Sequence, residues 1–231
     1  MKQRLKQFIL SEREKIGHLS RRQAAAYIWD YYKIPIVGLA CLLLLIMYLS
    51  AHFRSAVRDH WFYIMFADTR AEAGNGSALH EGYLRYTGFD TSEKAVDFNA
   101  EAWFDYTVNE ARGNRYFELF AGLTDAGVLD AVTMEPDALT GIGKSGRLMD
   151  LTDERCRSIR EKYGDRFLYS VPYNTEYSTE PVPIGIDVSD SILMTQYHMY
   201  ESGCALGIGA FSENIDAAEL FLDYIFTNGA S

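Results

Sequence analysis

The run Trp61-Phe62-Tyr63-Ile64-Met65-Phe66-Ala67 (WFYIMFA) is a continuous apolar stretch of strand length that ends at Asp68. A run of this kind is typical of a strand that is buried in an α/β sheet. A polar, glycine-containing loop, Glu72–Ser77, follows it and leads into a helical stretch around Ala78–Tyr86. This order of strand, loop and helix predicts the first unit of an α/β domain.

The same alternation continues to the end of the chain. Apart from a brief extended segment at 148–152, strands are expected at 61–67, 94–99, 128–134, 166–173, 182–187 and 205–211. Helices are expected at 78–86, 109–126, from Pro136, at 154–163, 191–200 and 215–227. Strands that alternate with helices predict an α/β fold with a mainly parallel sheet. Residues 54–231 suffice for one domain or two small lobes.

A longer apolar stretch precedes this domain. Twenty residues without a formal charge, Ile34 to Phe53, lie between Lys33 and Arg54. At about 1.5 Å per residue, a helix of this length spans roughly 30 Å, the hydrocarbon thickness of a bilayer. Aromatic residues flank the stretch on both sides, as they do at membrane–water interfaces. The sequence therefore predicts one transmembrane helix at 34–53, and the alternative is a buried core helix.

Basic residues set the expected orientation of this helix. Eight Lys and Arg residues precede it, whereas only Arg54 and Arg58 follow it closely. By the positive-inside rule, residues 1–33 form a basic cytoplasmic tail and residues 54–231 form an extracytoplasmic domain. We expect an uncleaved signal anchor in the cell membrane. The alternative is a cleaved signal peptide, with cleavage after Ala51.

Charge is divided unevenly between the two parts of the chain. The chain has 22 Lys+Arg and 32 Asp+Glu, a formal net charge of −10. Residues 1–51 carry eight basic and three acidic side chains, a net charge of +5, which leaves −15 on residues 52–231. Because an acidic domain repels phosphate backbones, we expect no nucleic-acid partner. The basic tail either lies on the anionic inner leaflet or extends the membrane helix.

No motif in the sequence favours catalysis. The stretch Gly141–Gly146 contains Gly-Lys-Ser, but the phosphate-loop pattern requires a glycine at the position of Ala138. The five histidines lack metal-ligand spacing, and no G-x-S-x-G nucleophile elbow is present. We therefore expect no enzymatic activity, no metal and no cofactor.

Cys156 and Cys204 are the two cysteines of the predicted outer domain, where oxidation is possible. One interpretation is a disulfide between them. The other is a pair of small buried residues, and the sequence leaves both open.

Ligand binding is the remaining function, because ligands of open α/β sheets bind beyond the carboxyl ends of the strands. Asp68 with Thr69, Glu135, Tyr173 and Asp187 occupy such positions in the predicted strands. Carboxylates attract cations, and aromatic rings stack on cationic or sugar-like solutes. These five residues are the candidate ligand-binding residues. The alternative for each of them is a solvated residue at a strand end.

Several motifs of the outer domain resemble bacterial extracellular solute-binding proteins. Leu129–Met134 and the later Gly146–Thr152 resemble the strand and the "G-x-L-x-D-L-T" passage of that family. Pro183–Ser191 is similar to its return strand, and Gly207–Tyr224 to its C-terminal passage. The resemblance implies a periplasmic-binding-protein-like domain.

The whole chain is similar to a short, membrane-tethered group of these bacterial proteins. In that group a basic tail and a motif like Trp29–Lys33 lead into the anchor. The resemblance covers roughly 27–50 and 61–227, which is shorter than a usual two-lobed protein, so it implies a reduced second lobe. We expect a single-pass protein whose outer domain captures or senses a small-molecule solute. The alternative is an interaction scaffold or accessory subunit that docks a membrane-protein partner.

Overall fold

The computed structural model describes residues 60–104, 115–171 and 180–227, together with scattered residues between 22 and 47. The chain divides into two units, Met1–Val57 and Arg58–Ser231. In the first unit the described residues are helical, and Leu42 to Leu45 are each more than half exposed. Among all described residues, no helix is long and apolar enough to cross a membrane. Parts of the predicted span 34–53 lie outside the described residues.

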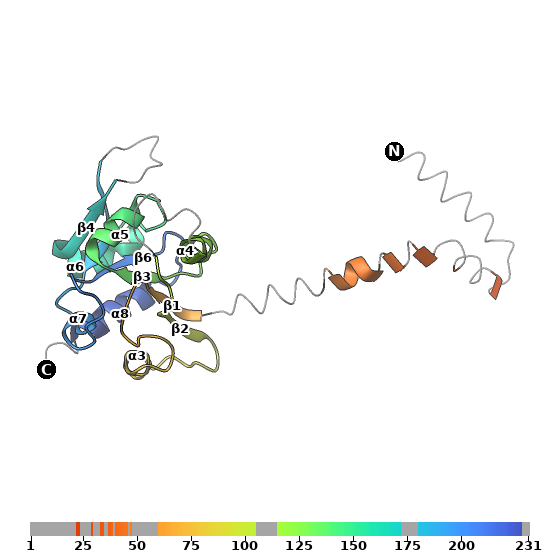
Figure 1. Cartoon of the computed structure of the whole chain (residues 1–231), viewed down its shortest axis with the longest axis horizontal. Helices are drawn as coiled ribbons and strands as arrows, with labels where there is room; N and C mark the ends of the chain where they lie inside the picture. The colour runs from red at the N-terminus through yellow and green to blue at the C-terminus, as the bar shows by residue number, and fades with distance from the viewer. Residues whose placement is uncertain are drawn as a thin grey trace. The chain divides into compact units, whose positions relative to one another are not determined.

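The second unit alternates strands and helices, as Figure 1 shows. Its strands are β1 (His60–Phe66), β2 (Ala95–Asn99), β3 (Ala131–Met134), β4 (Phe167–Ser170), β5 (Val182–Asp187) and β6 (Ala205–Ile208). Its α-helices are α3 (Ala78–Thr87), α4 (Arg115–Asp125), α5 (Pro136–Gly143), α6 (Arg157–Tyr163), α7 (Ile192–Thr195) and α8 (Ile215–Thr227). Two short 3₁₀ turns, Glu154–Cys156 and Gly164–Arg166, flank α6.

The strands form one six-stranded sheet in the order β2-β1-β3-β6-β5-β4. β1 pairs in parallel with β2 and β3, whereas the β3–β6, β6–β5 and β5–β4 pairs are antiparallel. It follows that β1, β2, β3 and β5 run in one direction and that β4 and β6 run in the other. The predicted α/β class and the mostly parallel direction of the strands are confirmed. The two reversed strands make the sheet mixed.

The reversal of β6 follows from the shortness of α7. A parallel connection needs a long crossover, usually a helix that runs the length of the sheet. A helix was expected at 191–200, but α7 forms only one turn, Ile192–Thr195. The chain therefore stays at the edge where β5 ends, and Asp187 of β5 lies opposite Ala205 of β6. The expected helix length is wrong, and this shortness makes the pair antiparallel.

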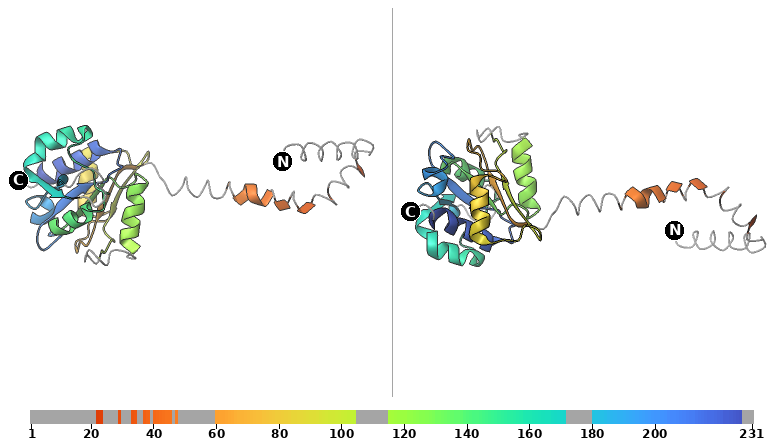
Figure 2. Two further views of the ribbon diagram at one scale, coloured as in Figure 1. Left: turned by 90° about the horizontal axis from the view of Figure 1, so that it is seen from above. Right: turned by 90° about the horizontal axis from the view of Figure 1, so that it is seen from below.

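Two apolar cores lie on opposite faces of the sheet. Phe62, Ile64 and Phe66 of β1 point into the core that α3, α6, α7 and α8 cover. Met65 and Ala67 point into the other core, against α4 and α5. Figure 2 shows α3 and α4 on opposite sides of the strands. The period-two alternation of β1 thus supplies both cores and makes β1 a central strand.

The first residues of α3 are fixed by a cap that also shapes the neighbouring loop. The Ser77 hydroxyl oxygen accepts from the backbone N–H of His80 at 3.2 Å. At the other end, Gly88 adopts a left-handed conformation, with φ of 68°, and its N–H bonds to the Leu84 carbonyl. Such caps satisfy backbone groups that the helix itself leaves unpaired. They hold α3 at the ends expected from the sequence to within one residue.

Candidate functional site

The carboxyl edge of the sheet brings several predicted residues together. β1 lies between β2 and β3, so the chain leaves β1 on one side and returns on the other, and ligands bind at this kind of reversal. Asp68 and Thr69 follow β1, Glu135 follows β3 and Asp187 ends β5, all at this edge. The fifth candidate, Tyr173, lies outside the described residues.

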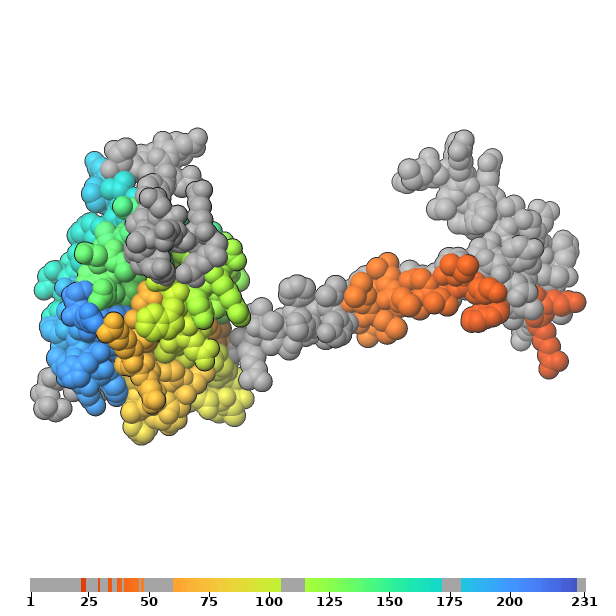
Figure 3. All heavy atoms as spheres, viewed as in Figure 1, coloured from red at the N-terminus to blue at the C-terminus, as the bar shows by residue number. Residues whose placement is uncertain are grey.

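Asp68 and Thr69 hold neighbouring loops in place. Asp68 has a positive φ of 58°, and its carboxylate accepts from the backbone N–H of Phe104 at 2.6 Å. The hydroxyl of buried Thr69 donates to the carbonyl of Met199 at 3.2 Å. Figure 3 shows the orange-to-yellow surface of the segment that leads into α3 beside the blue surface of the C-terminal part of the domain. These two candidates therefore tie the loop after β1 to the segments after β2 and α7.

Glu135 and Asp187 likewise accept hydrogen bonds from backbone N–H groups. One carboxylate oxygen of Glu135 accepts from the backbone N–H groups of Glu201 at 3.2 Å and Ser202 at 3.1 Å. Hydrogen bonding, first from the Ser202 side chain, lowers the pKa of Glu135 below its ordinary value. Asp187 accepts from the N–H of Ser189 at 2.9 Å. The structure thus gathers four of the predicted residues, and each of them holds backbone at the edge.

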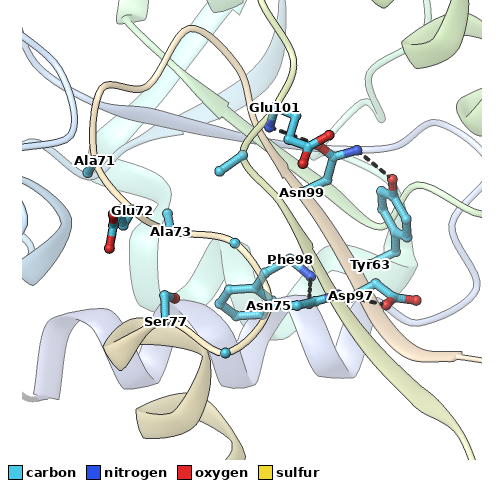
Figure 4. A pocket seen from close by; sticks show the side chains of 13 residues that line it. Tyr63, Ala71, Glu72, Ala73, Asn75, Ser77, Asp97, Phe98, Asn99 and Glu101 are labelled. Atoms are coloured by element: carbon cyan, nitrogen blue, oxygen red, sulfur yellow. Dashed lines mark hydrogen bonds between the residues drawn. The ribbon is translucent and has the colours of Figure 1, made fainter.

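An open hollow of about 840 Å³ lies beside this edge, between the loop after β1 and the end of β2 (Figure 4). Its lining comes from β1, from the loop and from the end of β2, namely Tyr63, Ala71, Glu72, Ala73, Gly74, Asn75, Gly76, Ser77, Asp97, Phe98, Asn99, Ala100 and Glu101. The volume is within the range of small-molecule sites. None of the four predicted residues that the structure describes lines this hollow.

Asn75 fastens one wall of the hollow to the other. Its backbone N–H donates to the Phe98 carbonyl at 3.1 Å, and its side-chain oxygen accepts from the Phe98 N–H at 2.7 Å. Its amide nitrogen donates to the Asp97 carboxylate at 3.2 Å. The loop is therefore held against β2 by three hydrogen bonds from one residue, which keeps the hollow preformed.

His80 provides a second fastening. Its Nε2 lies 3.1 Å from the Val96 carbonyl oxygen, and its Nδ1 lies 3.1 Å from the backbone nitrogen of Gly76. A carbonyl can only accept and a backbone N–H can only donate, so the ring carries its proton on Nε2 and accepts at Nδ1. The neutral imidazole satisfies both groups and joins α3, the loop and β2.

Asn99 holds in place the side of the hollow that is formed by Tyr63 and Glu101. Its amide nitrogen donates to the Tyr63 hydroxyl oxygen at 3.0 Å, and its side-chain oxygen accepts from the Glu101 N–H at 3.0 Å. Burial raises the pKa of Tyr63, so the phenol keeps its proton. Since Tyr63 accepts from Asn99, its own O–H can donate to a bound molecule.

The charge of the hollow is negative. Glu72, Asp97 and Glu101 place three carboxylates in its lining, and none of them forms an ion pair with a described Lys or Arg. Carboxylates accept hydrogen bonds from ammonium, guanidinium and hydroxyl groups. The lining therefore suits a cationic or hydroxyl-rich molecule. The strand-end rule that selected Asp68 would have found Glu101 as well, had it been applied to the end of β2.

A cluster of His, Asp and Ser lies at the opposite, amino edge of the sheet. Asp130 is fully buried, and its carboxylate accepts from the Ser212 hydroxyl at 2.6 Å, the Tyr63 N–H at 2.8 Å and the Asn214 amide at 3.3 Å. His60 Nε2 lies 3.3 Å from the same carboxylate. Ser212 bonds to the aspartate rather than to the histidine and is itself buried. The cluster therefore joins the starts of β1, β3 and α8 and does not form a nucleophilic triad.

Cys156 and Cys204 are both free and buried, so no disulfide joins them. Cys156 Sγ lies 3.4 Å from Met149 Sδ, and burial raises the pKa of its thiol to about 11. Burial also raises the pKa of Cys204. Both thiols stay protonated and apolar at neutral pH, in keeping with two small buried residues.

Two further motifs have structural roles. Gly141 to Gly143 end α5, and Gly146 turns the chain with φ of 69°, so Gly-Lys-Ser follows a helix, whereas a phosphate loop precedes one. Within the described ranges, no group of three His, Cys, Asp or Glu residues is arranged to hold a metal ion.

Comparison with known proteins gave no match. No protein-family model, curated protein or solved structure is significantly similar to this chain.

Proposed function

We propose that this chain is a single-pass membrane protein whose domain, residues 54–231, captures or senses a small cationic or hydroxyl-rich solute outside the cell. The observation that carries the proposal is the acid-lined hollow at the carboxyl ends of β1 and β2. It lies beside the carboxyl end of β2, on the side of the sheet where ligands of α/β proteins bind, and its walls are fixed in advance by Asn75, His80 and Asn99.

The ligand class follows from the groups in the lining. Glu72, Asp97 and Glu101 offer acceptors, and the Tyr63 hydroxyl adds one donor. An aliphatic amine or a guanidine pairs with such carboxylates through charge-assisted hydrogen bonds. A hydroxyl-rich solute uses the same acceptors more weakly. We propose binding without chemical conversion, because the lining residues that the structure describes include no nucleophile held by a general base.

Three features support the membrane anchor. The uncharged stretch 34–53 has the length of a bilayer span, and Lys and Arg are concentrated before it. Leu42 to Leu45 are helical and expose 51%, 53%, 64% and 52% of their surface. Exposed apolar groups of this kind indicate contact with lipid or with another protein.

The proposal is tested on the full-length chain in lipid nanodiscs, with spermidine as the cationic probe and glucose as the uncharged one. Isothermal titration calorimetry measures the Kd for wild type, Asp97→Asn and Glu101→Gln. The matched control is Glu93→Gln, which removes one exposed acid near the other end of β2. Loss of one charge-assisted bond is expected to weaken spermidine binding about tenfold, and the control is expected to keep wild-type affinity.

Equal spermidine affinity in Glu101→Gln and Glu93→Gln would show binding by overall charge alone and would contradict the proposed site. If neither probe binds, the alternative is favoured, namely an interaction scaffold or accessory subunit of a membrane complex. Cross-linking in intact membranes then identifies the protein that it contacts.

A further inference from the structure

A second hollow lies between three helices, apart from the acid-lined one. It has a volume of about 620 Å³, and its lining comes from α3, from α7 with the turn that follows it, and from α8. The lining residues are Ala78, Gly82, Arg85, Tyr86, Ile192, Gln196, Tyr197 and Tyr224. Three segments that are distant in the sequence thus meet around it.

Gly82 lets a tyrosine approach the backbone of α3. A Cβ atom at this position would overlap the hydroxyl group of Tyr224, so any larger residue would displace that side chain. The rings of Tyr86 and Tyr224 lie with centroids 5.4 Å apart at an interplanar angle of 47°. The absence of a side chain at Gly82 therefore fixes one wall of the hollow, and two aromatic rings meet there.

The charge of this hollow is opposite in sign to that of the domain. Among the described residues of the lining, Arg85 alone is charged, whereas residues 52–231 carry a net charge of −15. Arg147, Arg157 and Arg166 each pair with a carboxylate. Arg85 forms no ion pair with any described residue and lies on the exposed side of α3.

The positive charge of the Arg85 guanidinium affects the pKa of two neighbouring tyrosines. Burial raises the pKa of Tyr224 to about 12 and also raises the pKa of Tyr197, and in both cases Arg85 opposes the rise. The positive charge is therefore close to two of the three phenols that line the hollow. A bound anion would meet the same charge together with O–H and amide donors.

We propose that this hollow binds a small organic carboxylate, with Arg85 as its counter-ion. A guanidinium presents parallel N–H donors that match the two oxygens of a carboxylate. The amide of Gln196 and the hydroxyl of Tyr197 supply further donors. The rings of Tyr86 and Tyr224 offer an apolar surface to the rest of the molecule. This site is independent of the proposed cation site, because the two linings share no residue.

The test uses the full-length chain in nanodiscs of zwitterionic lipid, so that lipid headgroups do not add net anionic charge. Benzoate, succinate and inorganic phosphate are the probes, and calorimetry gives the Kd. Arg85→Gln is expected to weaken benzoate binding about tenfold or more, and Tyr197→Phe about threefold. The matched control is Arg115→Gln, which removes an exposed arginine without an ion pair to a described residue, on α4. It is expected to bind benzoate within about twofold of wild type.

Thermal melting confirms that each variant is folded, which is expected because Arg85 and Arg115 are both exposed. Glu101→Gln serves as the test of independence and is expected to leave benzoate affinity unchanged. Three results would overturn the proposal: no benzoate binding at about 10 mM, equal binding by Arg85→Gln and wild type, or tighter binding of phosphate than of benzoate.

Discussion

Asp130 and Glu101 are both carboxylates beside strand ends, but Asp130 is fully buried at the amino edge of the sheet and Glu101 is exposed at the carboxyl edge. The Asp130 carboxylate accepts from three donors, one on β1 and two on the segment that leads into α8. That of Glu101 forms no ion pair with a described residue and faces an open hollow. The comparison separates a carboxylate at the amino edge that maintains the fold from one at the carboxyl edge that is available to a ligand.

The largest expected effect is at the amino edge. Asp130→Ala removes the acceptor of the Tyr63 N–H, the Ser212 hydroxyl and the Asn214 amide, and it leaves the buried Ser212 hydroxyl and two partly buried donors without this acceptor. We expect the free energy of unfolding to fall by about 3–5 kcal/mol, measured by urea denaturation. Asp130→Asn should lose less, because its amide oxygen still accepts from Ser212. A loss below about 1 kcal/mol in Asp130→Ala would remove the distinction between the two edges.

Substitution of Glu135, at the carboxyl edge, is expected to have a smaller effect on the free energy of unfolding. Its lowered pKa means that the folded state favours the carboxylate, so its stabilisation is present above the ordinary value of 4.5 and disappears as the pH falls through the folded-state pKa. Glu135→Gln is expected to cost less than about 1 kcal/mol at pH 7, because the group is partly exposed. The difference from wild type should vanish in acid. A difference that persists at pH 2 would point to packing rather than to charge.

The smallest effect is expected at the exposed pair of Arg70 with Glu201. Both side chains are 73% exposed, so water and salt screen the interaction. A double-mutant cycle with Arg70→Gln and Glu201→Gln should give a coupling below about 0.5 kcal/mol, lower still in high salt. A coupling energy larger than the loss of stability in Glu135→Gln would mean that this ion pair stabilises the carboxyl edge more than Glu135 does.

The sequence predicts most elements of the domain because their patterns are local. Val182–Asp187 and Ile215–Thr227 have the predicted bounds, and β1 starts one residue before the predicted run. β3 begins at Ala131, three residues later than predicted, although the Asp130 N–H still bonds to the Tyr63 carbonyl at 3.0 Å. Periodicity and helix caps depend on residues that are close in the sequence, so elements of this kind can be predicted from it.

Strand order and the hollow depend on distant contacts. β6 packs closely against α5, since a Cβ at Gly207 would lie 3.1 Å from side-chain carbons of Leu139 and Leu148. The hollow depends on Asn75 reaching Phe98, which is 23 residues away. Neither contact produces a periodic pattern in the sequence. The carboxyl ends of the strands can therefore be predicted, whereas the residues that line the hollow cannot.

The fastening of β2 by Asn75 and His80 has a consequence for aggregation. β2 is an edge strand, and the backbone groups of Val96 and Phe98 that these side chains satisfy lie on its outer side. Unpaired groups along an edge strand are the template on which other chains add strands. The loop that forms the hollow therefore also blocks self-association along β2. A substitution that detaches the loop would expose unpaired backbone groups to which another chain could bind as a strand.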